Sequence, residues 1–449
     1  MNNQRHSPII DRNPDEIIAF RAGLEVDAAK FISQANALAG RLPKHRYVFN
    51  LYSDRYEFLL GFCAAVIAGQ CTLMPPNRLD KTLDELASEY PDSYTLGGAG
   101  NEDGLNLLQP HDSSHVTDAH DSPLPVIPAD QLCAIAFTSG STGKPSANLK
   151  YWHTLKQGTL GNIDLLLKRF NTRLNVVATV PPQHMWGLET SILLPLFANV
   201  AISDRTPFYP QDIVDAIESV PAPRALVSSP VHLNALEKSG VPLRGVDVIF
   251  SATAPMSMEL AQALENRFDT CVLEVFGCTE SGILAARHTS EETLWHLSEL
   301  FELEPGEAGT VVKAGHLSEN VIIGDRIEKK GEYRFKWLGR HQDMINIAGK
   351  RGSLTDLNQQ LLSINGVTDG VIFSPQHTPE RLAALVVAPN LKPSDIIDAM
   401  KPMVDPVFLP RPVYLVPMLP RQETGKLANA AVMSLLDEIS GSGKRKEQS

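Results

Sequence analysis

One short stretch of the sequence combines residue types that are suited to holding phosphate groups. It runs from Phe137 to Pro145 and reads Phe-Thr-Ser-Gly-Ser-Thr-Gly-Lys-Pro. Glycines let backbone N–H groups close on an anion, hydroxyl side chains add donors, and a lysine adds a mobile positive charge. The residues that would do this are Thr138, Ser139, Gly140, Ser141, Thr142, Gly143 and Lys144. The stretch therefore predicts a loop that binds a polyphosphate.

The spacing of this loop differs from that of the P-loop nucleotide hydrolases. Their signature places four residues between its glycines and a Ser or Thr after the lysine. Here two residues separate Gly140 from Gly143, and Pro145 follows Lys144. The spacing therefore disfavours a P-loop kinase or nucleotidase. A P-loop kinase or nucleotidase is kept as an alternative hypothesis. Such an enzyme would hydrolyse ATP to ADP and would not need a carboxylic acid as a second substrate.

Strand and helix patterns alternate around the loop. The apolar run Leu132–Phe137 predicts a buried strand that leads straight into it. Further buried strands are predicted downstream at Val176–Val180, Ala225–Ser229, Val246–Ser251 and Cys271–Phe276, with helices at Asp212–Ser219 and Met256–Phe268. This alternation indicates a mostly parallel sheet with helices on both faces. Ligands of such sheets bind beyond the carboxyl ends of the strands, which is where the motifs described below fall, apart from a lysine near the C-terminus.

The two ends of the chain have different patterns. Before the loop we expect a helix with one apolar face from Ala28 to Leu38, a strand at Tyr47–Leu51 and a helix at Tyr56–Ala68. Beyond Pro305 the sequence predicts short strands, a helix near Asp356–Ile364 and a final helix at Ala428–Ile439. The predicted fold class is therefore α/β. We expect a large N-terminal domain of layered, mostly parallel α/β sheets, followed by a small C-terminal α+β domain.

Composition limits the classes of function. The chain has 449 residues, enough for two or three domains, with 43% hydrophobic and 20% charged residues, which is ordinary for a globular enzyme. The formal net charge of −12 argues against a nucleic-acid binder. The most apolar stretch, Phe58–Gly69, is too short to span a bilayer. Residues 1–12 lack the apolar core of a signal peptide.

The cysteines and clustered histidines have simple interpretations. Five cysteines without CxxC spacing predict free thiols in a reducing compartment, so we expect a cytoplasmic protein. They are Cys63, Cys71, Cys133, Cys271 and Cys278. Three histidines lie among acids in the polar stretch 91–130, at His111, His115 and His120. A metal site there is possible by residue type, but the spacing matches no structural zinc pattern and favours a solvated loop.

The phosphate loop resembles that of the adenylate-forming superfamily. This superfamily includes acyl- and aryl-CoA synthetases, peptide-synthetase adenylation domains and luciferases. Downstream segments resemble its other motifs in the same order, namely Pro181–Gly187, Ser251–Pro255, Glu274–Gly282, Gly324-Asp325, Gly339–Gly349 and Leu419–Lys426. The resemblance covers roughly residues 27 to 435. It is strong at the loop, at Phe276–Glu280 and at Gly425-Lys426, and patchy elsewhere.

The resemblance implies where the nucleotide binds. Besides the loop residues 138–144, it assigns adenine contacts to the small turn Ala252, Thr253 and Ala254 and to Phe276 with Gly277. Thr279 would donate a hydrogen bond to the α-phosphate, and Glu280 would hold Mg²⁺, which prefers carboxylates together with phosphate oxygens. Asp325 would accept hydrogen bonds from the ribose hydroxyls, and Arg340 would contact ribose and phosphate. A strand end followed by a turn is the alternative interpretation of Phe276–Glu280.

The resemblance also implies an acid site, a catalytic lysine and a hinge. His184 would gate or bind the carboxylate, while Trp186, Val231, Ala252 and Gly282 would line the acid pocket; the alternative is a core histidine and tryptophan on a loop. Lys426 would bridge the substrate carboxylate and the α-phosphate, stabilising the charge that develops on attack. Gln342 would be the hinge between an adenylation domain, residues 1–341, and a mobile C-terminal domain, residues 343–449.

Several residues depart from the family's pattern. Alanine replaces the usual glycine in the 251–255 turn, and Ser146 stands where many members have a second lysine. Gln342 replaces the usual acid and Asn346 the usual lysine of the hinge segment. None of these changes removes Thr279, Glu280 or Lys426, so the resemblance still implies a working catalyst.

The implied function is that of an acid–thiol ligase that uses ATP and Mg²⁺. The enzyme would form an acyl-adenylate and then pass the acyl group to the thiol of CoA or of a carrier protein's phosphopantetheine. Compact stand-alone members resemble ligases that load an aromatic acid, such as a hydroxybenzoate, in aryl-polyene pigment pathways. A medium-chain fatty acyl-CoA or acyl-carrier synthetase and a non-catalytic adenylate-binding relative are the alternatives. No nucleic-acid partner or membrane span is expected, and the oligomeric state is not predicted.

Overall fold

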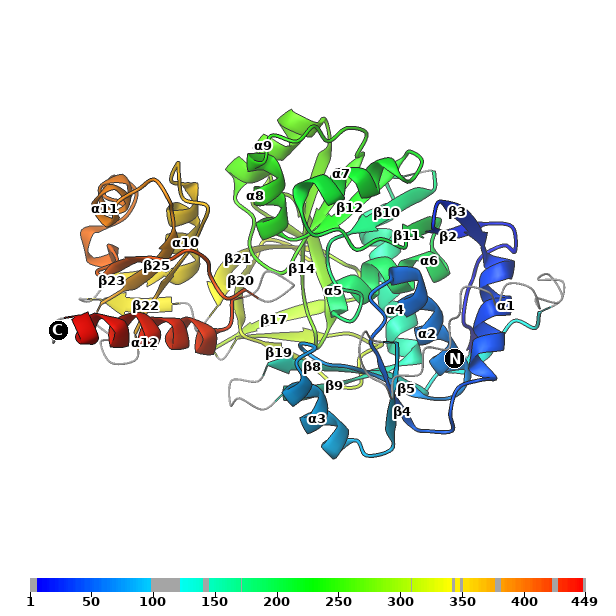
Figure 1. Ribbon diagram of the computed structural model, residues 1–449. Helices are drawn as coiled ribbons and strands as arrows, with labels where there is room; N and C mark the ends of the chain where they lie inside the picture. Colours follow the sequence, from blue (N-terminus) through cyan, green and yellow to red (C-terminus); the bar gives the residue numbers. More distant parts are fainter. Residues whose placement is uncertain are drawn as a thin grey trace. The chain divides into compact units, whose positions relative to one another are not determined.

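The computed structural model describes residues 6–97, 122–139, 145–170, 172–307, 309–340, 344–347, 350–375, 381–421 and 427–446. The chain divides into two compact units (Figure 1). Unit 1 comprises Met1–Glu302 with Val312–Val321, and unit 2 comprises Leu303–Val311 with Ile322–Ser449.

Unit 1 is built on a wide, mostly parallel sheet with the strand order β16-β15-β14-β13-β12-β10-β11-β2-β3. Its strands are β2 (Ile17–Arg21), β3 (Leu24–Asp27), β10 (Leu174–Ala178), β11 (Val200–Ser203), β12 (Arg224–Ser228), β13 (Val248–Ser251), β14 (Cys271–Cys278), β15 (Gly282–His288) and β16 (Trp295–Leu297). Strands β2, β11, β10, β12, β13 and β14 pair in parallel, whereas β3, β15 and β16 pair antiparallel with their neighbours. Every residue of β10, β11 and β13 is buried, as expected for strands that helices cover on both faces.

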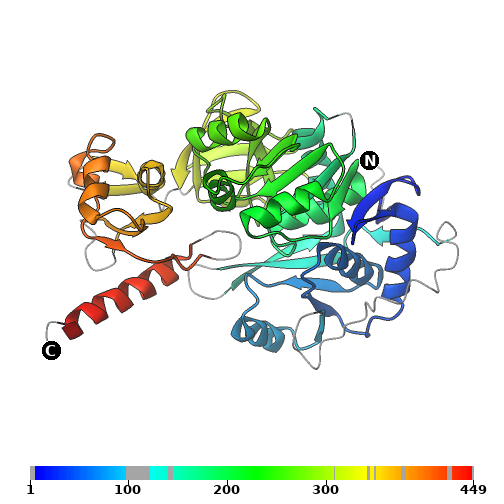
Figure 2. The same ribbon diagram turned by 45° about the horizontal axis from the view of Figure 1, so that its top comes forward.

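Helices cover both faces of this sheet (Figures 1 and 2). On one face α7 (Pro210–Glu218), α8 (Pro230–Lys238) and α9 (Met258–Phe268) share a core with the sheet residues Val177 and Ile249. The other face packs in a second core against α1 (Ala28–Ala39), α2 (Arg55–Ile67), α4 (Trp152–Asn162), α5 (Met185–Leu188) and α6 (Leu194–Phe197). Short π-helical turns, η3 (Ile163–Leu167) and η4 (Glu189–Leu193), extend α4 and α5. Turns of this kind occur often at functional sites.

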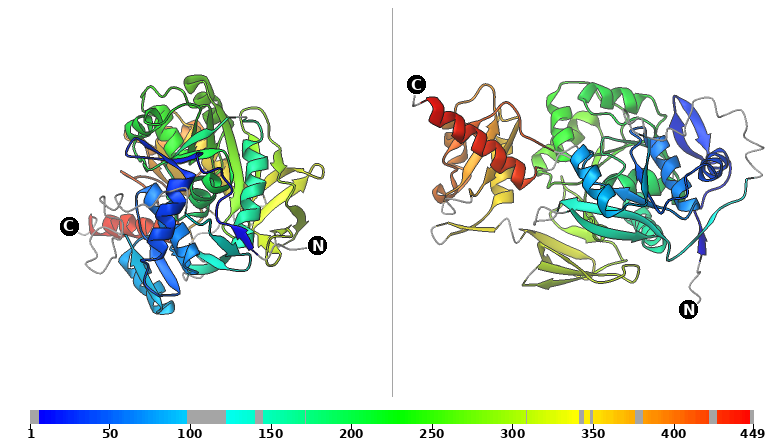
Figure 3. Two further views of the ribbon diagram at one scale, coloured as in Figure 1. Left: turned by 90° about the vertical axis from the view of Figure 1, so that its right-hand side faces the viewer. Right: turned by 60° about the horizontal axis from the view of Figure 1, so that its bottom comes forward.

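A second sheet lies beyond this second layer of helices, with strand order β6-β4-β5-β8-β9. Its strands are β4 (Tyr47–Asn50), β5 (Cys71–Met74), β6 (Ser93–Leu96), β8 (Leu132–Ser139) and β9 (Pro145–Tyr151). One face contributes Val48, Met74 and Ala134 to the core that contains α1 and α2. The other face packs against Leu86 of α3 (Asp80–Glu89). A small pair, β1 (His6–Pro8) and β7 (Val126–Pro128), completes unit 1, and Figure 3 shows these layers from two further sides.

Unit 2 contains several small sheets and a few helices. A hairpin joins β20 (Asp325–Lys329) to β21 (Arg334–Arg340), and a second one joins β22 (Met344–Ile347) to β23 (Lys350–Ser353). The sheet β24 (Asp369–Phe373), β25 (Ala383–Val387) and β26 (Val413–Leu415) packs with α10 (Leu354–Ser363), α11 (Pro393–Met400), η6 (Pro406–Phe408) and α12 (Asn429–Lys446). The strands β17 (Glu302–Gly306), β18 (Gly309–Lys313) and β19 (Val321–Ile323) form a further sheet where the chain passes between the units.

The structure confirms the predicted α/β class with its layered, mostly parallel sheets. The predicted strands and helices are present with ends that shift by a few residues, except that α12 continues to Lys446 instead of stopping at Ile439. All five cysteines are free, but Cys271 and Cys278 are only partly buried. No helix among the described residues is long and apolar enough to cross a membrane. The histidines at 111, 115 and 120 and the hinge residue Gln342 lie outside the described residues, so the predicted domain boundary there stays a prediction.

Candidate active site

The carboxyl ends of parallel strands meet at one edge of the large sheet of unit 1. Ser228, which ends β12, is paired with Ser251, which ends β13, and Ser251 is paired with Glu274 of β14. Strand β10 runs parallel beside β12. The segments that follow these strands therefore lie at the same edge. These segments carry the predicted site residues of unit 1 from His184 to Gly282.

Trp186 is fixed in the loop and helix that follow β10. Its side chain is buried, and its indole Nε1 donates a hydrogen bond of 3.2 Å to the carbonyl of Ser228. His184 is half-buried and occupies the N-cap position of α5. The guanidinium of Arg55 on α2 donates to the carbonyls of Ala178 and Val180, at 2.9 and 2.8 Å. The start of the loop is thus held in place from α2.

The segments after β12 and β13 carry small and partly buried side chains. Val231 lies in the first turn of α8 and is half-buried. The neighbouring His232 is buried, and its Nδ1 lies 2.9 Å from the Oγ of Ser229. Burial lowers the pKa of His232. In the turn after β13, Ala252 is buried and Thr253 adopts a φ of 81°, which brings the backbone of this turn into the left-handed region.

The strand that carries Phe276 is longer than predicted. The sequence predicts that it ends at Phe276, whereas β14 continues to Cys278, so Gly277 lies inside the strand. Phe276 and Gly277 belong to β14, and the pairing with β15 shifts register between them. A side chain at Gly277 would meet the carbonyl oxygen of Gly282 at 2.4 Å, so only glycine fits this bulge. Thr279 and Glu280 form the turn that joins β14 to β15, and both are half-buried.

Two buried residues of opposite charge hold this turn and the start of β15. The Nζ of Lys150, on β9, donates a hydrogen bond of 2.9 Å to the carbonyl of Glu280. The carboxylate of Glu189 accepts from the backbone N–H of Ile283 at 3.1 Å and from the Nδ2 of Asn162 at 3.2 Å. Lys150 and Glu189 are 3% and 6% exposed. The position of Glu280 therefore depends on two residues outside every predicted motif.

Burial and mutual attraction oppose each other in this pair. Burial lowers the pKa of Lys150, while the nearby charge of Glu189 raises it. Burial raises the pKa of Glu189, while the hydrogen bond from Ile283, that from Asn162 and the charge of Lys150 lower it. Neither residue could be found from the sequence, because neither spacing nor composition links a lysine in a strand to a glutamate 39 positions later.

The phosphate loop joins two paired strands of the second sheet. Strands β8 and β9 pair antiparallel, with Thr138 opposite Ser146 and Ser139 opposite Pro145. The Oγ1 of Thr138 lies 2.6 Å from the Oγ of Ser146. Thr138 and Ser139 therefore belong to β8 itself. Residues 140–144, which include Lys144, lie outside the described residues, so their predicted role stays a prediction.

Asp325 organises a polar group within unit 2. It begins β20 and is 5% exposed. Its Oδ1 accepts a hydrogen bond of 2.8 Å from the Nε1 of Trp337, and the Nε of Arg340 lies 3.4 Å from the same oxygen. The hydroxyl of Thr310 donates to the carbonyl of Asp325 at 2.7 Å. The structure thus brings together Asp325 and Arg340, the two residues predicted to contact the ribose.

The predicted catalytic lysine, Lys426, lies outside the described residues, but the two residues that flank residues 422–426 are described. Arg421 and Leu427 form an isolated antiparallel bridge. The guanidinium of Arg421 donates to both carboxylate oxygens of Asp369, at 2.7 and 2.6 Å. A bidentate pair of this kind fixes direction as well as distance.

Comparison with known proteins identifies the family. The sequence profile of a family described as AMP-binding enzyme matches residues 55–312, which is more than half of the chain. The chain belongs to the AMP-binding enzyme family. This finding confirms the resemblance to adenylate-forming enzymes and the expectation of an AMP-forming acid–thiol ligase.

Two curated proteins and one solved structure show what the chain is similar to. The 3,4-dihydroxybenzoate–[aryl-carrier protein] ligase of Bacillus anthracis is 20% identical and aligns with 67% of this chain and 73% of its own length. Surfactin synthase subunit 3 of Bacillus subtilis (strain 168) is 23% identical, and the match covers 93% of this chain but 37% of that protein. Among solved structures, ATP-bound MatB from Rhodopseudomonas palustris superposes with a TM-score of 0.78 at 18% identity, over 96% of this chain and 97% of MatB. The last match shows a shared fold.

Proposed function

We propose that this AMP-binding enzyme activates a small aromatic carboxylic acid, such as a hydroxybenzoate, and transfers it to a phosphopantetheine thiol. The observation that carries the proposal is the segment from Phe276 to Gly282. It presents an aromatic ring near the end of β14, and a hydroxyl and a carboxylate on the turn that follows, which buried charges hold in place. The aryl-carrier ligase relative acts on a dihydroxybenzoate, which supports an aromatic acid. Because other relatives are CoA ligases, CoA and a carrier protein are both candidate acceptors.

The first half-reaction would join the acid to ATP. A carboxylate oxygen attacks the α-phosphorus, the bond from that phosphorus to the bridging oxygen breaks, and pyrophosphate leaves with both electrons of that bond. In this proposal Phe276 stacks on the adenine ring, Asp325 holds the ribose, and Thr279 donates to the α-phosphate. Lys426 bridges the two anions that must meet. Catalysis of this kind depends on positioning and electrostatic stabilisation.

The turn between β14 and β15 fits a magnesium ion by its donor set. Glu280 contributes a carboxylate and Thr279 a hydroxyl, both half-buried, and Mg²⁺ prefers such hard oxygen ligands together with phosphate oxygens. When bound beside Glu280, the ion would neutralise charge on the phosphates. The carbonyl of Glu280 points to Lys150, so the hydrogen bond from Lys150 fixes the backbone from which the carboxylate projects.

The second half-reaction would release AMP. The phosphopantetheine sulfur attacks the acyl carbon, the bond from that carbon to the phosphate oxygen breaks, and a thioester and AMP are formed. Trp186 provides a flat, buried indole whose N–H is already satisfied by Ser228, which suits an aromatic ring as neighbour. A cytoplasmic location remains a prediction from the free cysteines.

Pyrophosphate–ATP exchange with a panel of acids tests the proposal. The panel contains hydroxybenzoates, cinnamates, medium-chain fatty acids and amino acids, and the variants are Lys426→Ala and Thr279→Val. Lys330→Ala, which removes an exposed lysine of unit 2, is the matched control. We expect exchange with hydroxybenzoates, and a loss of about 100-fold or more in Lys426→Ala, because one oxyanion-stabilising group is worth that much. ATP binding should persist in that variant.

Two results would contradict the proposal. Exchange with fatty acids alone would replace the substrate class. Folded protein that binds ATP and exchanges with no acid of the panel would favour a non-catalytic relative. The acceptor is tested separately, by comparing thioester formation with CoA and with a phosphopantetheinylated aryl-carrier protein after the acid is known.

A further inference from the structure

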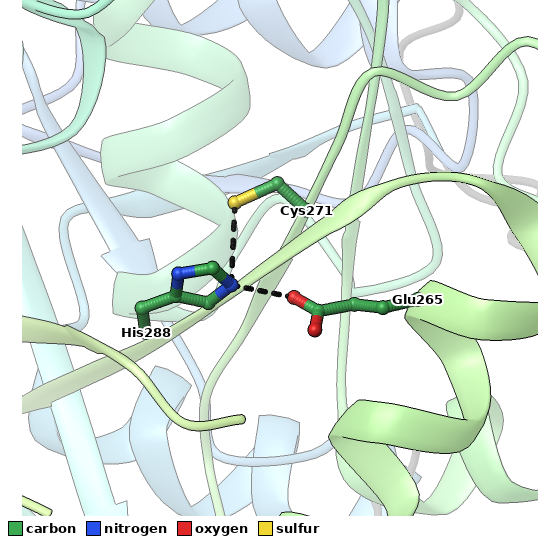
Figure 4. Close-up of side chains that lie close together, drawn as sticks. All are labelled: Glu265, Cys271 and His288. Carbon is green, nitrogen blue, oxygen red and sulfur yellow. Dashed lines mark hydrogen bonds and ion pairs between the residues drawn. The ribbon is translucent and has the colours of Figure 1, made fainter. Parts of the chain in front are cut away.

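Three potential metal ligands meet at the end of the large sheet opposite the candidate active site (Figure 4). Cys271 is the first residue of β14 and His288 is the last residue of β15, and the antiparallel pairing of these strands places them close together. Glu265 comes from the last turns of α9. The cluster therefore joins three consecutive elements of the chain. It lies at the start of β14, whereas Thr279 and Glu280 follow the end of that strand.

The ligand atoms are close enough to share one ion. One ligand atom of each residue lies within 4.8 Å of the other two. The Nε2 of His288 lies 2.6 Å from the Oε1 of Glu265 and 3.8 Å from the Sγ of Cys271. Zinc binds thiolate, imidazole and carboxylate at about 2.0 to 2.3 Å in a tetrahedron, so its ligands stand roughly 3.3 to 3.8 Å apart. The distance between the Sγ of Cys271 and the Nε2 of His288 already lies in this range. The carboxylate of Glu265 would have to move away from the Nε2 of His288 by less than about 1 Å.

The surroundings resemble those of a bound metal ion. The Nδ1 of His288 lies 3.1 Å from the Oε2 of Glu291, and a metal-binding histidine usually donates its other N–H to a carboxylate in this way. The backbone N–H of Val272 donates to the Oε1 of Glu265 at 2.8 Å, which fixes that carboxylate. Arg169 approaches the Sγ of Cys271 at 3.6 Å. A guanidinium at this distance can donate to a thiolate that is bound to a metal.

A simple ion pair between His288 and Glu265 explains less of the arrangement. Such a pair needs one carboxylate, yet Glu265 and Glu291 each approach a different nitrogen of the same imidazole. A neutral imidazole has a single N–H and can donate to only one of these two carboxylates. A divalent cation at the Nε2 would take Glu265 as a further ligand and leave the N–H of Nδ1 for Glu291. Glu265 and His288 are 18% and 21% exposed, so an ion can enter from solvent.

We infer that Glu265, Cys271 and His288 form a zinc site that ties α9 to the β14–β15 hairpin, with water in the fourth position. The site is structural. It is separate from the acid–thiol ligase chemistry, and the inference does not depend on the proposed function.

Cobalt substitution tests the site directly. The full-length chain is reduced, stripped with a chelator and titrated with Co²⁺, which reports a thiolate ligand by a sulfur-to-metal charge-transfer band and a tetrahedral site by intense visible bands. We expect both bands, saturation at one ion per chain, and displacement by Zn²⁺. Zinc affinity is then measured by competition with a chromophoric chelator.

Variants separate this site from other metal-binding groups. Cys271→Ser should abolish the charge-transfer band, His288→Gln should weaken zinc binding by at least about 100-fold, and Glu291→Gln should weaken it by about 10- to 100-fold. His296→Gln is the matched control, because His296 pairs with Glu292 at 2.7 Å without a neighbouring thiol that the structure describes. Its zinc binding should equal that of the unchanged protein.

Thermal unfolding shows whether each variant is folded, so that a loss of zinc binding can be distinguished from a loss of structure. Zinc should raise the melting temperature of the unchanged protein and of His296→Gln, but not that of Cys271→Ser or His288→Gln. Absence of the charge-transfer band in the unchanged protein would overturn the inference. So would zinc binding of equal strength in folded Cys271→Ser and His288→Gln.

Discussion

Replacing Lys150 with methionine should destabilise unit 1 in a manner that depends strongly on pH. Methionine keeps the length of the buried side chain but removes its charge and its hydrogen bond to the carbonyl of Glu280. The carboxylate of Glu189 then stays buried without its counter-charge. Removing one partner of a buried pair typically costs about 3 to 5 kcal/mol.

Protonation of Glu189 sets a ceiling on the electrostatic part of this cost. The ordinary pKa of a glutamate is 4.5, and burial already raises that of Glu189. Without Lys150 the carboxylate of Glu189 can avoid being buried as a charge by taking up a proton. Protonating a group with an unfolded pKa of 4.5 costs about 1.4 kcal/mol for each pH unit above that value, so the cost at pH 7 is at most about 3.4 kcal/mol. The ceiling falls to about 0.7 kcal/mol at pH 5. The lost hydrogen bond adds about 1 kcal/mol at either pH.

The sign of the effect follows from linkage. In Lys150→Met the folded pKa of Glu189 lies above its unfolded value, so the folded state binds more protons. Stability is then retained below about pH 4.5 and lost as the pH rises through the folded pKa. We therefore expect the difference in free energy of unfolding between the variant and the unchanged protein to grow from pH 5 to pH 7, by at most about 2.7 kcal/mol.

Denaturant unfolding at pH 5, 6 and 7, followed by tryptophan fluorescence, measures this difference. The double variant Lys150→Met, Glu189→Gln should lose the pH dependence, because glutamine still accepts hydrogen bonds from Ile283 and Asn162 without a charge. Lys401→Met is the matched control, since Lys401 makes an exposed ion pair with Asp398 at 2.6 Å and should change stability by less than about 1 kcal/mol. Equal destabilisation by Lys150→Met at pH 5 and pH 7 would refute the reasoning.

Three further predictions concern single positions. Gly282→Ala should lower exchange activity and destabilise unit 1 by about 1 to 3 kcal/mol, because Gly282 has a φ of 80° and a Cβ would meet the Oε1 of Glu189 at 2.6 Å; an unchanged melting temperature would contradict this. His316→Gln should flatten the pH dependence of stability between pH 6.5 and 4. Burial lowers the pKa of His316 to about 4, so the folded state binds fewer protons and stability is lost as pH falls from 6.5; melting curves across this range decide the point. Asp325→Ala should cost about 1 to 3 kcal/mol by leaving the Nε1 of Trp337 unpaired and should weaken AMP binding in calorimetry, whereas Asp325→Asn should recover part of the stability.

The sequence predicted those parts of the fold that local patterns encode. Apolar runs such as Val176–Val180 predict buried strands because strands covered on both faces read as continuous apolar segments. Ser257 and Asp54 cap their helices with side-chain hydrogen bonds, in keeping with their residue types. The strand predicted to end at Phe276 continues to Cys278, because the antiparallel partner β15 pairs with Gly277 and Cys278. Such pairing is a tertiary property that no local pattern specifies.

The residues that hold the candidate site in place were harder to predict than the motifs that form it. Lys150 and Glu189 act on the turn around Glu280 only because β9 of one sheet and η4 of another layer approach it in space. The same holds for Cys271, which looked like an ordinary apolar thiol until folding placed it beside His288 and Glu265. Contacts between distant segments decide what such residues do, and one sequence contains no record of those contacts.

Arg55 has a consequence for how this enzyme can change its substrate. Its side chain is fully buried and holds the carbonyls of Ala178 and Val180, and its other nitrogen reaches the Oγ of Ser191 at 2.6 Å. The backbone that carries His184 and Trp186 is thereby anchored at its start and through η4, independently of those two side chains. New side chains at 184 and 186 can therefore be tried while these backbone contacts persist, although a substitution at 186 also gives up the hydrogen bond from Trp186 to Ser228. A library confined to these positions should retain folded members, whereas any exchange at Arg55 should remove the scaffold on which the library depends.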